Sequence, residues 1–412
     1  MCGIAGLVGR GPTDEGVLRR MADAIGHRGP DDDGLWRERE ARVGFGHRRL
    51  AIVDLSAAGH QPMASSDGRW TISYNGEIYN HAELRAELEA ADGQWRGHSD
   101  TESLVEAIAA WGLERALERA VGMFAISLWD SKERRLHLIR DRFGEKPLYY
   151  GLVGGDFAFA SELKALRVLA GFDNDIDRRA LGLYARLGYV PAPHSIYRGI
   201  CKLEPGCVLS GTPEELLAGE GRVERYWSYR DVVTAGLEAP IADEGEALDA
   251  LEAALREAVR GQAMADVPVG AFLSGGVDSS TVVALYRQES DVRTFTIGFE
   301  DAAFDEAPHA RAVAAYLGTR HHESRVTARE ALEVIPLLPR IYDEPFPDSS
   351  QIPTWLVCRH ARAQVKVALS GDGGDELFGG YNRHLVAAGA WGRLRRLPWP
   401  LRAVAGLTLR AL

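Results

Sequence analysis

The sequence predicts two successive domains, a layered α+β domain followed by an α/β domain with a parallel sheet. A chain of 412 residues is too long for one ordinary domain. Its first half shows short strands, then helices, then further strands, an order that is typical of layered α+β folds. From about residue 246 onward, apolar strands alternate with helices, which favours a parallel sheet with ligands at the carboxyl ends of its strands.

The first domain is expected to contain a strand at residues 70–74, where the residue pattern alternates. We expect this strand to end at Asn75-Gly76, because that dipeptide is typical of turns. Helices are expected at residues 81–91 and 101–111. Either Ser99 or Asp100 can cap the second of these helices. Further strands are expected at residues 122–129, 135–140, 148–152 and 156–160.

A stretch rich in Gly, Pro and Glu, residues 211–245, separates the two predicted domains. We therefore expect domains at residues 2–210 and 246–412, with a linker or peripheral region between them. Helices of the second domain are expected at residues 246–264, 279–287 and 305–317. Its strands are expected at residues 267–273, 293–299 and 365–369.

Composition is that of a globular protein from a reducing compartment. The hydrophobic fraction is 46% and the charged fraction is 26%, both near the average for folded domains. A net charge of -11 argues against non-specific binding to nucleic acid or to an anionic membrane, and no apolar run is long enough for a transmembrane helix. The four cysteines form neither a metal-binding pair nor a disulfide scaffold. We expect a cytoplasmic protein with small-molecule partners; a homodimer is compatible with the sequence, which does not decide the oligomeric state.

Cys2 is the first candidate for chemistry. A small residue at position 2 allows Met1 to be removed, which leaves a thiol and a free α-amine on the same residue. This amine has a pKa near neutrality and can take the thiol proton, so nucleophile and base come from one residue. Considered alone, Cys2 is better explained as a buried residue of a first strand.

Three further sites supply what the hydrolysis of a free amino-acid amide requires. Asn75 and Gly76 offer a side-chain amide and a backbone N–H for an oxyanion. Arg49 can bind a carboxylate through two parallel hydrogen bonds, and Asp100 can receive an α-ammonium group. Each has an ordinary alternative when taken singly: a turn at Asn75-Gly76, a surface ion pair at Arg49 and a helix cap at Asp100.

Five segments around these residues occur in an order that resembles class II glutamine amidotransferases. They are residues 2–6, 27–31, 47–54, 75–80 and 99–102. The resemblance implies an N-terminal-nucleophile αββα sandwich in which Cys2 is the nucleophile and Asn75 and Gly76 form the oxyanion hole. It also implies that glutamine is bound by Arg49, Asn75, Glu77 and Asp100. Residues 140–150 are family-like as well, and we interpret them as structural or channel-facing.

The run at residues 274–280 is suitably placed for an anion, because it follows a strand and opens a helix. Its glycines let backbone N–H groups approach a ligand, its serines donate, and the helix N-terminus adds a positive dipole. Asp278 can hold Mg²⁺ against phosphates. The run lacks the Gly-Lys-Ser/Thr of a Walker A loop, and a plain glycine-rich turn is the alternative. For His321-His322-Glu323, a solvated strand fits the spacing better than a metal site.

The second half resembles ATP pyrophosphatases, and asparagine synthetases in particular. The run at residues 274–280 is similar to their pyrophosphate loop, which implies ATP as a substrate. The implied contacts are Ser274, Gly275, Gly276, Asp278, Ser279 and Ser280. Residues 369–381 match the asparagine synthetase pattern, which implies that Asp375 is a second Mg²⁺ ligand beside Asp278. The residues expected to face an adenylated carboxylate and ammonia are Ser370, Gly371 and Asp372, although some family members carry Glu at the last of these; adenine and ribose contacts are expected at residues 296–299.

The sequence therefore predicts a glutamine-dependent asparagine synthetase: glutamine is hydrolysed at Cys2, and ammonia displaces AMP from an adenylated aspartate. One alternative keeps this chemistry with another acceptor, such as the carboxylate of a sugar in a surface polysaccharide. The other is a glutaminase or nucleotide-sensing protein without synthetase activity. The branch that makes purines or amino sugars is disfavoured, because it lacks the loop at residues 274–280. Neither the catalytic lysine of the family nor its Phe-Leu-Asp segment follows Tyr381, so we expect a C-terminally incomplete synthetase domain that makes little amide.

Overall fold

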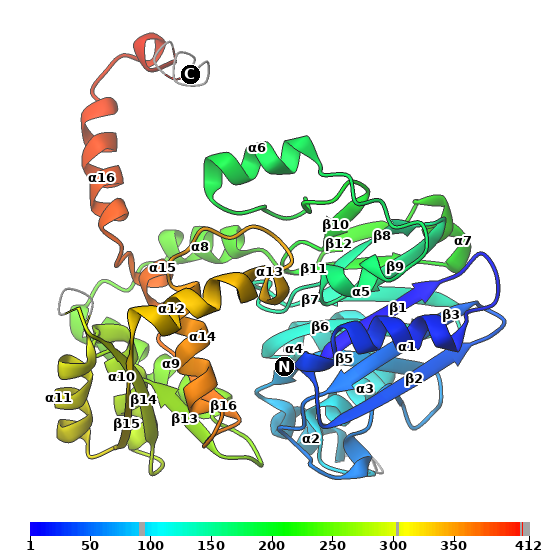
Figure 1. Cartoon of the computed structure of the whole chain (residues 1–412), viewed down its shortest axis with the longest axis horizontal. Coiled ribbons are helices and arrows are strands. Elements are labelled where there is room, and N and C mark those ends of the chain that lie inside the picture. Colours follow the sequence, from blue (N-terminus) through cyan, green and yellow to red (C-terminus); the bar gives the residue numbers. More distant parts are fainter. Residues whose placement is uncertain (90–94, 302–304, 404–405, 407–412) are drawn as a thin grey trace. The chain divides into compact units, whose positions relative to one another are not determined.

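The computed structural model describes residues 1–89, 95–301, 305–403 and 406 (Figure 1). By its internal contacts the chain divides into two units. The first contains Met1–Pro268 and Thr327–Val367, and the second contains Val269–Val326 and Ala368–Leu412. None of the described helices is long and apolar enough to span a lipid bilayer.

Two antiparallel sheets of six strands each form the centre of the first unit. The strands of the first sheet are β1 (Gly3–Val8), β2 (Asp32–Glu38), β3 (Val43–Arg49), β8 (Tyr149–Val153), β9 (Asp156–Ala160) and β10 (Ile200–Lys202). Those of the second sheet are β4 (Met63–Ala64), β5 (Trp70–Ile78), β6 (Gly122–Asp130), β7 (Arg135–Arg140), β11 (Cys207–Gly211) and β12 (Arg222–Arg225). Their spatial orders are β10-β8-β9-β1-β3-β2 and β12-β11-β7-β6-β5-β4.

Three hydrophobic cores separate four layers in this unit. One core lies between the sheets, where Phe45 of β3 and Trp129 of β6 are buried. A second core joins the first sheet to α1 (Glu15–Ala24), α5 (Leu163–Arg167) and α6 (Arg178–Leu187). The third core joins the second sheet to α2 (His81–Glu89), α3 (Asp100–Trp111) and α4 (Leu113–Arg119). Alternation along the strands produces these layers: in β6, Ile126 and Leu128 face the helices whereas Ala125 faces the other sheet.

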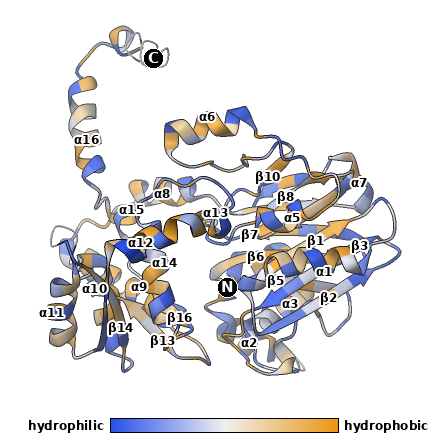
Figure 2. Cartoon of the chain, in the orientation of Figure 1, coloured by the Kyte–Doolittle hydropathy of each residue, from blue (hydrophilic) through white to orange (hydrophobic). Residues whose placement is uncertain are grey.

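The helix–sheet–sheet–helix order confirms the predicted αββα sandwich. Strand β1 is buried along its whole length, and its residues other than Gly3 and Gly6 are hydrophobic, so that much of the strand is orange in Figure 2. Such a strand is expected at the centre of a sheet that is covered on both faces. This central position brings Cys2, the residue directly before β1, to the middle of the sheet edge.

The second unit is built on the sheet β15-β14-β13-β16. Its strands are β13 (Val269–Phe272), β14 (Arg293–Phe299), β15 (Arg320–Val326) and β16 (Val367–Leu369). Strand β14 pairs in parallel with both β13 and β15. The connecting helices are α10 (Val277–Arg287) and α11 (Ala307–Leu317), and α15 (Gly374–Phe378) and α16 (Asn382–Leu394) come after β16. The alternation of strands and helices confirms the predicted parallel α/β sheet.

The remaining helices belong to the first unit. They are α7 (Pro213–Ala218), α8 (Tyr229–Glu238), α9 (Glu244–Gln262), α12 (Ala328–Val334), α13 (Leu338–Ile341) and α14 (Gln351–Ala361). Within residues 211–245, β12 forms the outer edge of the second sheet. Ser99 is the cap of α3, since its side chain accepts a hydrogen bond from the Glu102 N–H.

The expected turn at Asn75-Gly76 is wrong. Strand β5 continues through both residues, and Asn75 lies opposite Ala125 while Gly76 lies opposite Phe124 of β6. A Cβ at Gly76 would lie 2.1 Å from the Met123 carbonyl oxygen, so only glycine allows β5 and β6 to approach this closely. Pairing with a distant strand thus overrides the local turn preference of the dipeptide, and it places Asn75 inside a rigid strand.

Candidate active site

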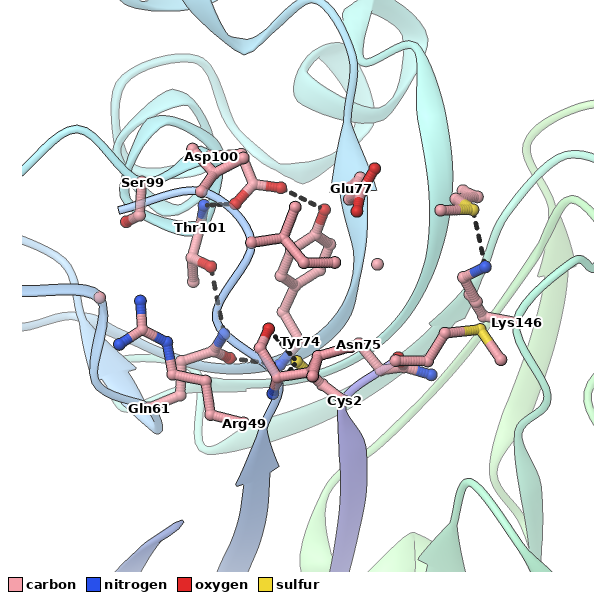
Figure 3. A pocket seen from close by; sticks show the side chains of 17 residues that line it. Cys2, Arg49, Gln61, Tyr74, Asn75, Glu77, Ser99, Asp100, Thr101 and Lys146 are labelled. Carbon is pink, nitrogen blue, oxygen red and sulfur yellow. Dashed lines mark hydrogen bonds between the residues drawn. The ribbon is translucent and has the colours of Figure 1, made fainter. Parts of the chain in front are cut away.

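One pocket of the first unit brings together all six residues that the sequence predicts for a glutamine site (Figure 3). They are Cys2, Arg49, Asn75, Gly76, Glu77 and Asp100. Cys2 precedes β1, Arg49 ends β3, and Asp100 begins α3. The other three follow one another along β5. Four separate elements therefore converge on the pocket.

The Cys2 thiol is held by backbone atoms at the base of the pocket. Its Sγ atom lies 3.3 Å from the Leu50 nitrogen, which donates to it, and the Cys2 carbonyl accepts a hydrogen bond of 2.8 Å from Arg28 Nε. Burial raises the pKa of the Cys2 thiol, although the nearby terminal amine opposes this effect. Burial also lowers the pKa of that amine, here on Met1, to about 6. At neutral pH the amine is therefore largely an uncharged base beside a protonated thiol.

Asn75 has the features of a group reserved for a ligand. It is fully buried on β5, and neither Nδ2 nor Oδ1 has a hydrogen-bond partner among the residues that the structure describes. Leaving a buried amide unpaired costs about 1–3 kcal/mol, so such groups are rare without a functional reason. The side chain lines the pocket beside Cys2, where a substrate carbonyl would receive its N–H.

The backbone of Gly76 can supply a second donor. Its opposite residue, Phe124, uses its N–H and C=O to bind Asp141. In an antiparallel pair, this means that Gly76 does not exchange hydrogen bonds with Phe124. The Gly76 N–H consequently points away from β6. Together with Asn75, it forms an arrangement suited to an oxyanion.

Arg49 is buried and does not form the surface ion pair considered as its ordinary alternative. Its guanidinium donates to the Ser56 carbonyl at 3.0 Å and to the Asp54 carbonyl. A Cβ at Gly59 would lie 1.9 Å from Nη2, so only glycine leaves room for this placement. Throughout the described ranges no carboxylate forms an ion pair with Arg49, whose charge therefore remains available to an anionic ligand.

Two acidic residues, Asp100 and Glu77, line the pocket. Asp100 accepts hydrogen bonds from the Tyr74 hydroxyl (2.7 Å) and from the Ile78 and Thr101 N–H groups (3.0 and 2.9 Å). Burial raises the pKa of Asp100, while the hydrogen bond from Tyr74 opposes it. Burial, and then the charge of Asp100, raise the pKa of Glu77 to about 7. The pocket thus offers an arginine for a carboxylate and two acids for an amine.

Gln61 and Lys146 also line the pocket, although neither was among the predicted site residues. Gln61 connects elements of the site: it accepts from the Tyr74 N–H at 2.7 Å and donates to the Thr101 hydroxyl at 3.1 Å. Lys146 is buried, and its Nζ atom lies 2.6 Å from the Met123 sulfur. Burial lowers the pKa of Lys146. The family-like run at residues 140–150 carried a signal for Lys146; no local pattern singled out Gln61.

The two loops predicted to bind nucleotide meet in the second unit. Loop 274–280 follows β13 and opens α10, and its Ser274 and Ser279 hydroxyls are 3.0 Å apart. A Cβ at Gly371 would lie 2.6 Å from the Ser279 nitrogen, and one at Gly374 would lie 2.5 Å from the Asp278 carboxylate. The loop after β16 is therefore packed against the first loop. The loops follow β13 and β16, which are neighbours in the sheet. In α/β folds with a parallel sheet, ligands bind at the carboxyl ends of the strands.

These loops fit a phosphate ligand with Mg²⁺. The Ser280 hydroxyl is buried and has no hydrogen-bond partner within the described part of the chain. Helix α10 begins at Val277, so its first N–H groups and its dipole face the loop. No group of three or more His, Cys, Asp or Glu side chains that could hold a metal is present among residues 1–89, 95–301, 305–403 and 406. Mg²⁺ typically needs only one or two carboxylates beside phosphate oxygens and water, which Asp278 and Asp375 can provide.

Comparison with known proteins decides the family. A family described as glutamine amidotransferase domain matches residues 1–227, and one described as asparagine synthase matches residues 250–412. A putative asparagine synthetase [glutamine-hydrolyzing] 2 of Methanocaldococcus jannaschii is 39% identical over 428 residues, covering 98% of this chain and 80% of that protein. The chain belongs to the glutamine-hydrolysing asparagine synthetase family.

In two bacterial members of the asparagine synthetase family, the match covers a smaller share of the relative's own length. Asparagine synthetase [glutamine-hydrolyzing] 1 of Bacillus subtilis is 37% identical over 390 residues, which are 93% of this chain and 59% of that protein. A putative asparagine synthetase of Mycobacterium bovis is 39% identical, over 92% of this chain and 60% of its own length. The chain thus spans about three fifths of the length of these two bacterial relatives. Within this family, the pocket lies in the amidotransferase match and the two loops lie in the synthase match.

Proposed function

We propose that this family member hydrolyses glutamine at Cys2 and uses the ammonia, with ATP, to amidate a carboxylate, the side chain of aspartate. The observation that carries the first half is the buried amide of Asn75, which has no partner among the described residues and shares one pocket with Cys2, Arg49 and Asp100. The packing of the two glycine-rich loops supports the second half. Aspartate as the acceptor is supported by the names of the relatives.

In the proposed glutaminase reaction, Arg49 binds the α-carboxylate of glutamine while Asp100 and Glu77 receive its α-ammonium group. Removal of Met1 places the α-amine on Cys2, where it takes the thiol proton directly or through water. The thiolate attacks the γ-carboxamide, and the oxyanion is stabilised by Asn75 Nδ2 and the Gly76 N–H. The protonated α-amine returns its proton to the leaving nitrogen as the C–N bond breaks, so ammonia leaves, and water then hydrolyses the γ-glutamyl thioester to glutamate.

In the proposed synthetase reaction, ATP is bound at the loop of residues 274–280. The helix dipole of α10 and the serine hydroxyls hold its phosphates. Mg²⁺, when bound through Asp278 and Asp375, would supply positive charge that neutralises the phosphates. The acceptor carboxylate attacks the α-phosphate and releases pyrophosphate, and ammonia then displaces AMP. Ser370, Gly371 and Asp372 are proposed to face the acceptor.

The acceptor is tested by supplying ATP, ammonia and different carboxylates to the same enzyme. Aspartate, glutamate and a sugar uronic acid would each be assayed for amide formation and for AMP release. Amide made from aspartate alone supports the proposal. Amide made from the uronic acid alone would contradict aspartate as acceptor while retaining the chemistry of both sites.

Asp278→Ala is expected to weaken Mg-ATP binding and leave glutamine hydrolysis nearly unchanged, because the two sites lie in different units. Loss of a metal-binding carboxylate should raise the dissociation constant by at least about tenfold. Calorimetric titration with Mg-ATP and a glutamate-release assay measure the two effects. Asp291→Ala is the control, since Asp291 is an exposed acid of the same unit. An equal collapse of glutamate release in a folded Asp278 variant would contradict two separate sites.

The KM for glutamine is expected to fall as the pH rises through about 7. Below its pKa of about 7, Glu77 is protonated and neutral; above it, the charged carboxylate attracts the α-ammonium group. If the charged form alone binds, KM should change by up to about tenfold per pH unit below that pKa. Steady-state kinetics between about pH 5.5 and 8.5 measure this, with Glu77→Gln as the comparison. The same slope in both proteins would assign the effect to another group.

A further inference from the structure

Asp266 lies outside the amidotransferase match, between α9 and β13, yet its side chain contacts the loop behind the pocket. Its Oδ2 atom accepts a hydrogen bond of 2.7 Å from the Asp54 backbone N–H. The same atom lies 2.7 Å from Nε2 of His98. The Asp266 backbone N–H donates to the carbonyl of Ile52 at 2.9 Å, and Ile52 lines the pocket. Asp266 is thus hydrogen-bonded to Ile52, which lines the pocket, and to Asp54, which lies two positions further along the chain.

Asp54 connects Asp266 to Arg49. Its carbonyl oxygen accepts a hydrogen bond from the Arg49 guanidinium. Its backbone has φ 57°, a left-handed conformation that costs free energy for a residue other than glycine. The surrounding contacts must therefore hold this conformation in place. The Asp54 N–H is held by Asp266, and the buried Asp54 carboxylate accepts from the N–H groups of Ser56 (3.0 Å) and His98 (2.8 Å).

His98 extends the same contact to the other side of the pocket. Its ring is bonded to Asp266, and its backbone N–H is bonded to Asp54. The next residue, Ser99, caps α3, and Asp100 is the first residue of that helix. One carboxylate therefore supports both the segment that holds Arg49 and the segment that presents Asp100.

We propose that Asp266 is a positioning residue of the glutaminase site, which holds Arg49 and Asp100 at the spacing that one amino-acid substrate requires. The proposal rests on the glutaminase function proposed for this pocket. The nucleophile is supported by other contacts: Leu50 donates to Cys2 Sγ, and the adjacent Ala51 is bonded to Asp31 and Lys366. Loss of Asp266 should for this reason weaken glutamine binding more than the chemical step.

The test is the kinetics of glutamine hydrolysis by Asp266→Ala in the full chain. We expect KM to rise about 10- to 100-fold, the range typical of losing a hydrogen bond to a charged group, with kcat within about threefold of the wild type. Asp266→Asn keeps an acceptor for Asp54 and should recover part of the loss. Asp291→Ala, which removes an exposed acid with two arginine partners, should leave both constants unchanged.

A second measurement separates binding from chemistry. Calorimetric titration of L-glutamine into Cys2→Ala and into the Cys2→Ala, Asp266→Ala double variant should show the same 10- to 100-fold loss, roughly. An unchanged dissociation constant, or a kcat that falls as far as KM rises, would overturn the positioning role. A wild-type chain that does not hydrolyse glutamine would contradict the proposed function instead, and the titration would still decide whether Asp266 supports binding of the amino acid.

Discussion

Cys2→Ala is expected to abolish glutamate release from glutamine. Alanine has neither a nucleophile nor a proton to transfer, and the loss of a catalytic nucleophile costs on the order of 10⁴–10⁶ in kcat. Binding should survive, because Arg49, Asp100 and Glu77 come from other elements of the first unit. Glutamate is measured enzymatically over hours, and L-glutamine binding is measured by calorimetry.

Cys201→Ala is the matched control for this variant. Cys201 is also a half-buried cysteine of the first unit, on β10, but it does not line the pocket. Its replacement should leave glutamate release at the wild-type rate. Comparable release from Cys2→Ala would overturn the proposed nucleophile. Mass spectrometry of the N-terminus adds an independent check, since retention of Met1 should nearly abolish activity by placing the Cys2 nitrogen in a peptide bond.

Asn75→Ala is expected to lower kcat for glutamine hydrolysis by about 10²–10³-fold, the usual effect of removing one oxyanion donor. The stability of the Asn75→Ala variant is not expected to fall with its activity. The buried Asn75 amide has no partner within the described residues, so its removal relieves a desolvation cost of about 1–3 kcal/mol while opening a small cavity. The melting temperature is therefore expected to stay the same or to rise as activity falls. Calorimetric unfolding and glutamate release measure the two quantities on the same preparation.

Ser73→Ala provides the opposite pattern on the same strand. The buried Ser73 hydroxyl lies 3.0 Å from His47 Nδ1, so its loss should lower stability by about 1 kcal/mol. Ser73 does not line the pocket, and activity should be retained. If the melting temperature falls as much for Asn75→Ala as for Ser73→Ala, the Asn75 amide stabilises the fold and is not kept free for a ligand.

Local patterns were sufficient for several strands, and a family resemblance was sufficient for the choice of site residues. The strands predicted at residues 135–140, 156–160 and 293–299 have the same bounds as β7, β9 and β14. In residues 293–299 the apolar residues Phe295, Ile297 and Phe299 recur at every second position, as in a strand, so the information is contained within the segment. The six residues predicted for the glutamine site also converge on one pocket. They were chosen through the resemblance of five ordered segments to class II glutamine amidotransferases, because each motif alone had an ordinary alternative.

The features that only the tertiary structure decided depend on contacts between residues that are far apart in the sequence. The dipeptide Asn75-Gly76 favours a turn locally, but hydrogen bonds with β6 extend it into a strand. Gln61 enters the site because its amide connects β5 with α3, and neither neighbour can be inferred from the residues around it. Asp266 meets Asp54 across 212 positions. Such contacts form because folding brings distant segments together, and buried polar groups must then find hydrogen-bond partners. Sequence periodicity over a few residues does not indicate which distant group will be the partner.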